Sequence, residues 1–455
     1  MSSSLFKWRA RSARSFGSDQ TAKTEEIYVR ATTAFNRIIA IDGVAVSGVT
    51  FTPEGVVVRI RRRRRSHQCP CGWTTSSHYD RSTRRWRHLD LGLTKCFLEA
   101  EICRISCPRC RRVRTEDVPW ARPGARHTKD FCAVVAWLAQ RVDKTTITKL
   151  LRISWEAVAK IVIDVVGDVL NDDRFEGLVR LGVDEVSYRK GHRYLTVVAD
   201  HDRKGRVVWA QAGKSAATLG AFFDELGPQR VAKLEAISLD MGIAFENAVN
   251  EKAPHVRQCV DPFHLVALAN EAINQTRRWA WNEERRVAPP KLRGKPRLGE
   301  VRPRDQARWT KHTRWALLKD PANLSDEQLS VLHELRRSNS VLYRGWQLKE
   351  ALRDLYRLAN PKDAPAHLEW WLRWASRSRI PAFVKLAKTV RKNRERILAA
   401  VELNLSNSKL EGLNSKIRLI NHRGYGHHSA EAIIAMIYLC CGGLTIELPT
   451  TSLAA

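Results

Sequence analysis

The chain has 455 residues, a formal net charge of +30 at pH 7 and a sequence pI near 10.2. A positive charge of that size repels itself unless a polyanion neutralises it, so the composition favours nucleic acid, ahead of an anionic membrane surface or a merely solvated basic face. No segment approaches the roughly 18 to 20 apolar residues of a transmembrane helix, and the N-terminus lacks the apolar core of a signal peptide. We therefore expect a cytoplasmic, nucleoid-associated protein with no membrane partner, whose 10 cysteines form no disulfides.

The first part of the chain is predicted to be rich in β-strands. Residues 1–29 contain many Ser, Arg and Lys without periodicity, which is typical of a disordered basic extension. Two strand-like runs follow, at residues 37–48 and 56–60, with turn residues between them at Pro53, Glu54 and Gly55. We expect residues 30–120 to form a β-rich, zinc-ribbon-like DNA-binding domain.

Two cysteine pairs lie within this domain: Cys69 with Cys71, and Cys107 with Cys110. Two such pairs on separate hairpins can supply four thiolates to a tetrahedral zinc ion. The first pair has a spacer of only one residue, which strains the usual turn. Two alternatives therefore stay open: a degenerate ribbon that packs without metal, and a site in which His67 or His78 replaces a cysteine, with Cys103 nearby.

A basic strand and a helical segment follow as candidates for DNA contacts. Arg84, Arg85 and Arg87 surround a tryptophan, which suits a phosphate-binding surface but also an ordinary solvated strand. After a Pro- and Gly-containing linker at 119–124, apolar residues recur at helical spacing through residues 126–176, and Ser154 is placed to cap the third helix. The pattern predicts a helix-turn-helix, although many helical bundles share it. Its last helix is not strongly basic, so phosphate contacts would come from its flanks, with Lys160 as a candidate.

Residues 177–264 change to a strand period. Three strands joined by tight turns are followed by helix, strand, helix and strand, which predicts a mixed five-stranded sheet covered by helices. Asp184 lies near the end of the first strand and Asp240 directly after the fourth. An unpaired carboxylate there is costly, so the two are expected to share a cationic partner. A Gly-Lys-Ser sequence at 213–215 lacks the first glycine of a phosphate loop, which excludes a nucleoside triphosphatase.

The remainder of the chain is predicted to be helical. Residues 265–405 form a Trp-rich helical insertion, whose tryptophans build its core or, for one or two of them, stack on bases. Residues 406–445 form the final helices, with Glu411 near the start of the first, and residues 446–455 form a tail. Two divalent ions that stabilise an in-line phosphodiester displacement need about three carboxylates, and Asp184, Asp240 and Glu411 meet that need.

Several motifs resemble the bacterial insertion-sequence transposases of the ISL-three (ISL3) family. They are the opening segment 30–56, the cysteine pairs, Arg122-Pro-Gly-Ala-Arg126, Asp143-Lys-Thr-Thr, Gly182-Val-Asp-Glu185, Asp240, Asp261-Pro-Phe-His264 and Ser406-Asn-Ser-Lys-Leu-Glu-Gly-Leu-Asn414. The resemblance implies a zinc-ribbon and helix-turn-helix front end and an α/β RNase H-like catalytic domain with an all-helical insertion. The shortened first cysteine pair departs from the commoner pattern, and residues 1–29 have no counterpart.

The resemblance also assigns roles. It implies that Asp184, Asp240 and Glu411 bind two Mg²⁺ or Mn²⁺ ions. Asp261 and His264 match the pattern as residues that shape the edge of the active site, with a structural role for His264 in the core as the alternative. Further candidate DNA contacts are Asn414, Lys416, Arg423 and Tyr425. The expected protein is a transposase that oligomerises on DNA, binds terminal inverted repeats, cleaves strands and transfers them to target DNA. The alternative is a sequence-specific DNA-binding regulator with a catalytically inert RNase H-like domain.

Overall fold

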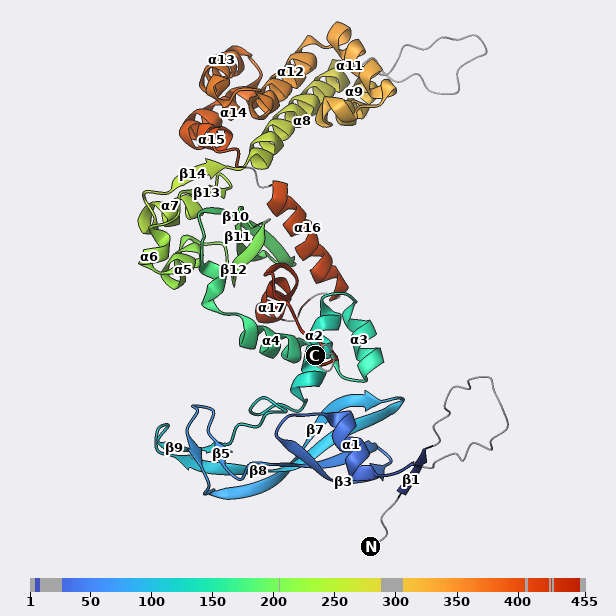
Figure 1. Ribbon diagram of the computed structural model, residues 1–455. Coiled ribbons are helices and arrows are strands. Elements are labelled where there is room, and N and C mark those ends of the chain that lie inside the picture. Colours follow the sequence, from blue (N-terminus) through green and yellow to red (C-terminus); the bar gives the residue numbers. More distant parts are fainter. Residues whose placement is uncertain are drawn as a thin grey trace, which may run out of the picture. The chain divides into compact units, whose positions relative to one another are not determined.

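The computed structural model describes residues 5–8, 27–203, 205–287, 306–405, 408–424, 427 and 429–450. The chain divides into two compact units, one comprising residues 1–169 and 444–455 and the other residues 170–443 (Figure 1). The predicted domains at 30–120 and 126–176 thus fall mainly within the first unit.

The start of the first unit differs from the sequence-based expectation. Within the predicted disordered extension, β1 (Leu5–Trp8) pairs antiparallel with β2 (Ile27–Arg30). The first predicted strand, 37–48, was wrong over its first part, because residues 31–39 form helix α1 (Ala31–Ile39) and the strand β3 (Val44–Thr52) begins later. Asn36 of α1 accepts a hydrogen bond from the backbone N–H of Val46 at 2.8 Å, which ties the helix to that strand. The β-branched residues near 38–41 favour a strand by their local propensity, but tertiary packing overrides this propensity and stabilises a helix.

The larger sheet of this unit has the order β3-β4-β8-β7, and β9 (Arg112–Thr115) pairs with β8. Its other strands are β4 (Gly55–Arg62), β7 (Asp80–Leu91) and β8 (Thr94–Cys107). The short strands β5 (His67–Gln68) and β6 (Thr74–Thr75) pair separately. The predicted linker at 119–124 is partly core, because Trp120 and Ala121 are buried with Trp86.

Three helices complete the first unit: α2 (Lys129–Ala139), α3 (Lys144–Leu151) and α4 (Trp155–Val169). Thr128 and Asp143 cap the first two helices, and Ser154 accepts a hydrogen bond from the Ala157 backbone N–H at 3.2 Å, as predicted. His88 of β7 bonds to the Thr128 hydroxyl at 2.9 Å, so the helices pack directly on the sheet.

The second unit contains the predicted mixed sheet, with strand order β12-β11-β10-β13-β14. The strands are β10 (Arg180–Arg189), β11 (Arg193–Asp200), β12 (Arg206–Ala212), β13 (Ala236–Leu239) and β14 (Arg257–Val260). The first three are antiparallel neighbours, whereas β13 runs parallel to both β10 and β14. Helices α5 (Ala216–Leu226), α6 (Pro228–Val231) and α7 (Ile243–Lys252) connect the later strands, and α5 and α7 bury Phe222, Phe223 and Phe245 in one core.

The helical insertion has a core of its own. Its helices are α8 (Pro262–Val287), α9 (Gln306–His312), α10 (Arg314–Leu318), α11 (Asp326–Ser338), α12 (Ser340–Asp354), α13 (Ala364–Arg377), α14 (Pro381–Lys392) and α15 (Arg394–Glu402). Trp371 is fully buried there and donates to the Leu348 carbonyl at 2.8 Å, whereas Trp279, Trp315 and Trp370 are more than half exposed. The predicted Trp-rich core is therefore built by only part of the tryptophans.

Two helices follow the insertion and return to the sheet, α16 (Ser408–Arg423) and α17 (Ala430–Cys441). Tyr438 of α17 accepts a hydrogen bond from the Ala210 backbone N–H at 3.0 Å, which places α17 against the edge strand β12. Among the helices that the model describes, none is long and apolar enough to span a membrane.

Candidate active site and metal centre

Three aspartates lie at the same edge of the sheet because their strands are parallel and in register. Gly182 of β10 pairs with Ser238 of β13, so Asp184 and Asp240, each two residues further on, are in equivalent positions. Leu239 pairs with Val260 of β14, which makes Asp240 and Asp261 equivalent in the same way. The carboxyl ends of adjacent parallel strands meet at one edge of an α/β sheet, where such folds place their sites.

The carboxylates of Asp184 and Asp240 are both half-buried and are fixed by local backbone donors. Asp184 Oδ1 accepts from the Glu185 N–H at 2.7 Å, and Asp240 Oδ1 accepts from the Gly242 N–H at 2.8 Å. Hydrogen bonds of this kind orient a carboxylate without neutralising it. Both groups thus retain oxygens for a hard cation.

Glu185 adds a further carboxylate to this edge. Burial raises its pKa, and the nearby negative charges of Asp240 and Asp184 raise it further, whereas Lys214 and His264 oppose the rise. The Lys214 ammonium lies 4.0 Å from Glu185 Oε2 and 4.1 Å from the centroid of the Tyr194 ring. The negative charges of these carboxylates repel one another, which favours a bound cation.

Helix α16 lies along β10 and contacts the first aspartate. The Asn414 amide, buried within α16, donates to Asp184 Oδ2, and the Asn421 amide donates to the Tyr188 carbonyl at 2.9 Å. Asn414 is therefore a partner of Asp184, and a direct DNA contact stays a prediction. Glu411 lies on α16, but its side chain falls outside the described residues, as does Tyr425.

The helical insertion reaches the second aspartate through Arg396 of α15. This guanidinium, 12% exposed, donates to the Asp240 main-chain carbonyl at 3.0 Å and to Glu246 Oε2 at 2.9 Å. One largely buried arginine thus joins α15, α7 and the strand end that carries Asp240.

Asp261 and His264 lie close to each other next to β14, and their role in shaping the edge of the site stays a prediction. Asp261 is 2% exposed, and its carboxylate accepts a hydrogen bond from the Phe263 N–H at 3.2 Å. Asp261 therefore caps the N-terminus of α8. His264 Nε2 lies 3.8 Å from Asp261 Oδ2. Burial and the charge of Asp261 raise the pKa of Tyr356, which places the insertion beside this aspartate as well.

The four predicted cysteine ligands converge in the first unit. The Sγ atoms of Cys69, Cys71, Cys107 and Cys110 all lie within 4.8 Å of one another. Two of the separations, Cys69 to Cys110 at 3.8 Å and Cys71 to Cys107 at 3.6 Å, match the roughly 3.8 Å edge of a tetrahedron with zinc–sulfur bonds of about 2.3 Å. The donor set therefore fits zinc despite the one-residue spacer. A hydrogen bond from the Trp73 backbone lowers the pKa of Cys71 to about 6, which favours its thiolate form.

The predicted DNA contacts in the first unit have different environments. Arg87 is 7% exposed, pairs with Asp90 and lies over the Phe131 ring, so its predicted role as a DNA contact is corrected to a structural one. Arg84 lies over the Trp86 ring, and Arg85 pairs with Glu99 at 3.0 Å. Lys160 pairs with Asp164 at 3.0 Å and remains 75% exposed. Of the four, only Arg87 is unavailable to a phosphate.

Two predicted contacts near the second-unit site are exposed. Lys416 donates to the Cys440 carbonyl at 2.6 Å, which ties α16 to α17, and Arg423 lies at the end of α16. Their contact with DNA stays a prediction.

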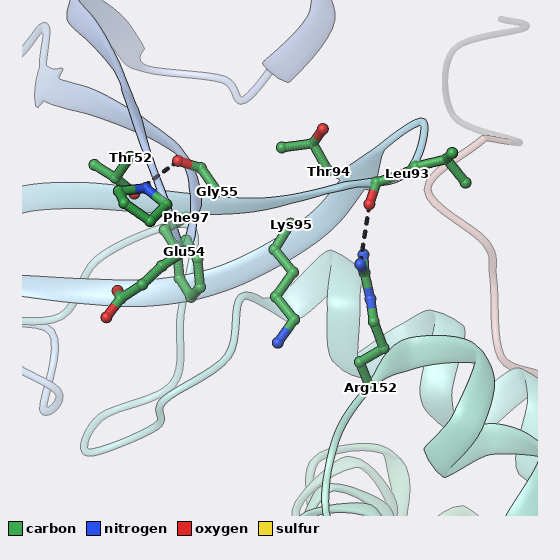
Figure 2. Close-up of a pocket in the computed structure, with 9 residues that line it drawn as sticks. Thr52, Glu54, Gly55, Leu93, Thr94, Lys95, Phe97 and Arg152 are labelled. Carbon is green, nitrogen blue, oxygen red and sulfur yellow. Dashed lines mark hydrogen bonds between the residues drawn. The ribbon is translucent and has the colours of Figure 1, made fainter.

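A hollow of about 630 Å³ lies within the first unit, where the β3–β4 turn and the β7–β8 turn face the end of α3 (Figure 2). Arg152 caps α3 in the left-handed conformation (φ 56°) and donates to the Leu93 carbonyl at 2.9 Å. It also pairs with Asp90. None of the predicted catalytic residues lines this hollow, and Arg152 fixes the helix-turn-helix to the sheet there.

Sequence reasoning missed Glu185, Lys214 and Arg396. Glu185 directly follows Asp184 in the chain, and this adjacency could have indicated that Glu185 belongs to the site. Lys214 belongs to the Gly-Lys-Ser sequence that was set aside because it forms no phosphate loop. Arg396 has no local signal, since it is one arginine among many in a basic helical region.

Together, the mixed sheet with aspartates on adjacent strand ends, the helical insertion, the helix-turn-helix and the cysteine ribbon define a DNA-processing enzyme with an RNase H-like catalytic domain. Residues 181–437 match a family model described as transposase, residues 116–166 the helix-turn-helix domain of transposase family ISL3, and residues 65–110 the zinc-finger of transposase IS204/IS1001/IS1096/IS1165. The chain belongs to the ISL3 family of insertion-sequence transposases.

Curated relatives cover most of the chain. The transposase for insertion sequence element IS1557 of Mycobacterium tuberculosis is 41% identical over 410 residues, which span 87% of this chain and 90% of that protein. The transposase for insertion sequence element IS1001 of Bordetella parapertussis is 27% identical over 362 residues, 79% of this chain and 85% of that protein. Membership of this family implies DNA binding and the use of divalent metal.

Proposed function

We propose that this transposase cleaves and joins DNA at the edge formed by Asp184, Asp240 and Glu411. The observation that supports it best is the equivalent register of Asp184 and Asp240 on adjacent parallel strands. Position 411 lies three residues before Asn414 on α16, one helical turn from the residue that donates to Asp184. This spacing supports placing Glu411 as the third carboxylate of the same edge.

The proposed cofactors are two Mg²⁺ or Mn²⁺ ions held by these three carboxylates, because hard cations prefer oxygen ligands. When bound, such a pair of ions stabilises the attacking and leaving oxygens of an in-line displacement. The protein's own part is to orient Asp184 through Asn414 and Asp240 through Arg396. Burial and the charge of Asp240 raise the pKa of Glu185, so its ionised form is disfavoured unless a cation is bound at this edge.

The first unit is proposed to bind the terminal inverted repeats of the element, with α4 of the helix-turn-helix in the major groove. Arg84, Arg85 and Lys160 would contact phosphates, and Lys416, Arg423 and Tyr425 would guide DNA beside the catalytic edge. Zinc is the proposed ion of the four-cysteine group. Two transposon ends need two catalytic edges, so we infer a homo-oligomer on DNA.

The test separates binding from cleavage. Asp184→Asn keeps the size of the side chain and removes its charge, so DNA binding should persist while Mg²⁺-dependent strand cleavage falls at least 100-fold, an effect of about 2.7 kcal/mol or more. Asp224→Asn is the matched control, because Asp224 is exposed on α5 and pairs with Lys252 at 2.8 Å, outside the site. Both variants are assayed by mobility shift and by nicking of a labelled terminal repeat.

The same assays with Glu411→Gln test the third ligand. Equal losses in Asp184→Asn and Glu411→Gln, with Asp224→Asn unaffected, would support the triad. Cleavage that survives either substitution would overturn this assignment.

A further inference from the structure

A second group of metal-binding side chains lies close to the four cysteines in the chain. One ligand atom each of His67, His78 and Cys103 lies within 4.8 Å of the other two. His67 and Cys103 are buried, whereas His78 is exposed. Imidazole nitrogen and thiolate sulfur are the ligands that Zn²⁺ prefers, and three protein ligands suffice for a tetrahedral ion with a fourth position open to solvent.

The fold builds the two groups from the same strands. Cys103 and Cys107 are four residues apart on β8 and, since side chains alternate along a strand, they face the same side, about 13 Å apart along it. His67 and Cys69 are two residues apart, so the β5 segment contributes to both groups. The Tyr79 N–H donates to the Arg104 carbonyl at 2.7 Å, which brings the segment of His78 beside Cys103.

Glu116 holds two of the three ligands in place. Its side chain is fully buried, its Oε2 lies 2.7 Å from His67 Nδ1, and its Oε1 accepts from the Cys103 backbone N–H at 2.7 Å. Arg62 pairs with the same carboxylate, which balances its charge. A carboxylate on one imidazole nitrogen orients the ring and leaves the other nitrogen for metal, as is usual for zinc-bound histidines.

We propose that His67, His78 and Cys103 form a second zinc site, separate from the four-cysteine site and braced by Glu116. The four cysteines already provide a complete tetrahedral set, so no histidine is needed to replace a cysteine there. A tetrahedral ion sets its ligand atoms roughly 3.3 to 3.8 Å apart, and rotation of the exposed His78 side chain closes the remaining distance. The second ion would cross-link β5, β8 and the segment before β7.

The test is the zinc content of the full chain, purified from zinc-supplied cells and measured by mass spectrometry. His78→Ala should lower the content by about one ion per chain, as should Cys103→Ser, because three ligands are the minimum for such a site. His192→Ala is the matched control, since His192 is an exposed histidine on the β10–β11 turn. Because His78 is exposed, its substitution should not unfold the protein, so a loss of zinc in this variant would not result from unfolding. Circular dichroism checks the fold of each variant.

Cobalt substitution distinguishes the two sites. In His78→Ala the sulfur-to-cobalt absorption of the four-cysteine site should persist, whereas Cys110→Ser should remove most of that absorption and leave the second ion bound. Zinc content unchanged by both His78→Ala and Cys103→Ser would overturn the proposal. Loss of the four-cysteine absorption together with the zinc in His78→Ala would also overturn it, because a single shared site would then explain the data.

Discussion

Arg396 is a largely buried residue that we predict to hold Asp240 in position. Its hydrogen bonds to the Asp240 carbonyl and to Glu246 are made from α15, a helix of the insertion that also packs into the insertion's core. Arg396→Ala should lower strand cleavage about ten-fold, or about 1.4 kcal/mol, while DNA binding stays the same, because it displaces a ligand without removing it. Arg396→Lys should recover part of the activity, since it keeps the pairing with Glu246.

Arg373→Ala is the control for this prediction, because Arg373 is 70% exposed and pairs with Glu369 within its own helix. Cleavage rates are measured on a pre-nicked and an intact substrate at saturating DNA. If the DNA affinity fell and the cleavage rate did not, Arg396 would act on DNA binding and would not position Asp240.

We predict that His88 contributes to the loss of stability of the first unit in acid. Burial, with the nearby charge of Arg87, lowers its pKa from 6.5 to about 4. Between pH 6.5 and pH 4 the His88 side chain is protonated in the unfolded chain but stays neutral in the folded protein. The free energy of unfolding therefore decreases as the pH falls from 6.5 towards 4, by up to about 3 kcal/mol. His88→Gln should make the free energy of unfolding less dependent on pH. It should also lower the stability somewhat at neutral pH, because the hydrogen bond to Thr128 is altered.

Cys96 provides the measurement for this prediction. It is fully buried and pairs across the strands with His88, so its labelling by a disulfide reagent active in acid reports opening of this part of the sheet. The ratio of labelling rates between wild type and His88→Gln should rise from pH 7 to pH 5. A constant ratio would contradict the assignment to His88.

At the scale of elements, α16 is held to β10 by two asparagines, Asn414 and Asn421. Asn421→Ala removes one net hydrogen bond worth about 1 kcal/mol, so amides of α16 should exchange about five-fold faster and cleavage should fall several-fold. Asn250→Ala is the control, because Asn250 bonds to Gln258 at 2.7 Å on the exposed end of α7. Hydrogen exchange by mass spectrometry measures the effect, and slower cleavage with unchanged exchange in α16 would show a role other than anchoring.

The elements that the sequence predicted correctly are those with a long, regular pattern. The strands and helices from β10 to β14 have clear patterns, and the parallel pairing of β10 with β13 puts Asp184 and Asp240 in equivalent positions. Helix α1 was missed because its β-branched residues resemble a strand, and its helical form depends on Asn36 contacting β3. The burial of Arg87 and the reach of Arg396 depend on contacts between segments far apart in the chain, which periodicity does not encode.

For the whole molecule, the net charge of +30 predicts how DNA binding responds to salt. Each phosphate neutralised by a cation contributes about −0.9 to the slope of log affinity against log salt concentration. Cations that already face carboxylates should contribute less than free ones. Arg85 lies near both Glu54 and Glu99, whereas Arg64 and Arg65 of the arginine run 61–65 are exposed.

The double variant Arg64→Ala/Arg65→Ala should therefore weaken binding and reduce the slope by up to about 1.8, the value for two lost phosphate contacts. Arg85→Ala should change it by less than about 0.9, because the arginine gives up its bonds to Glu99 before it reaches a phosphate. Asp184→Asn should leave the slope unchanged, since that site acts on DNA that is already bound. Affinities are measured by fluorescence anisotropy with a labelled terminal repeat over a range of salt concentrations. A larger change for Arg85→Ala than for the double variant would place the main phosphate contacts on β7 and not on Arg64 and Arg65, which follow β4.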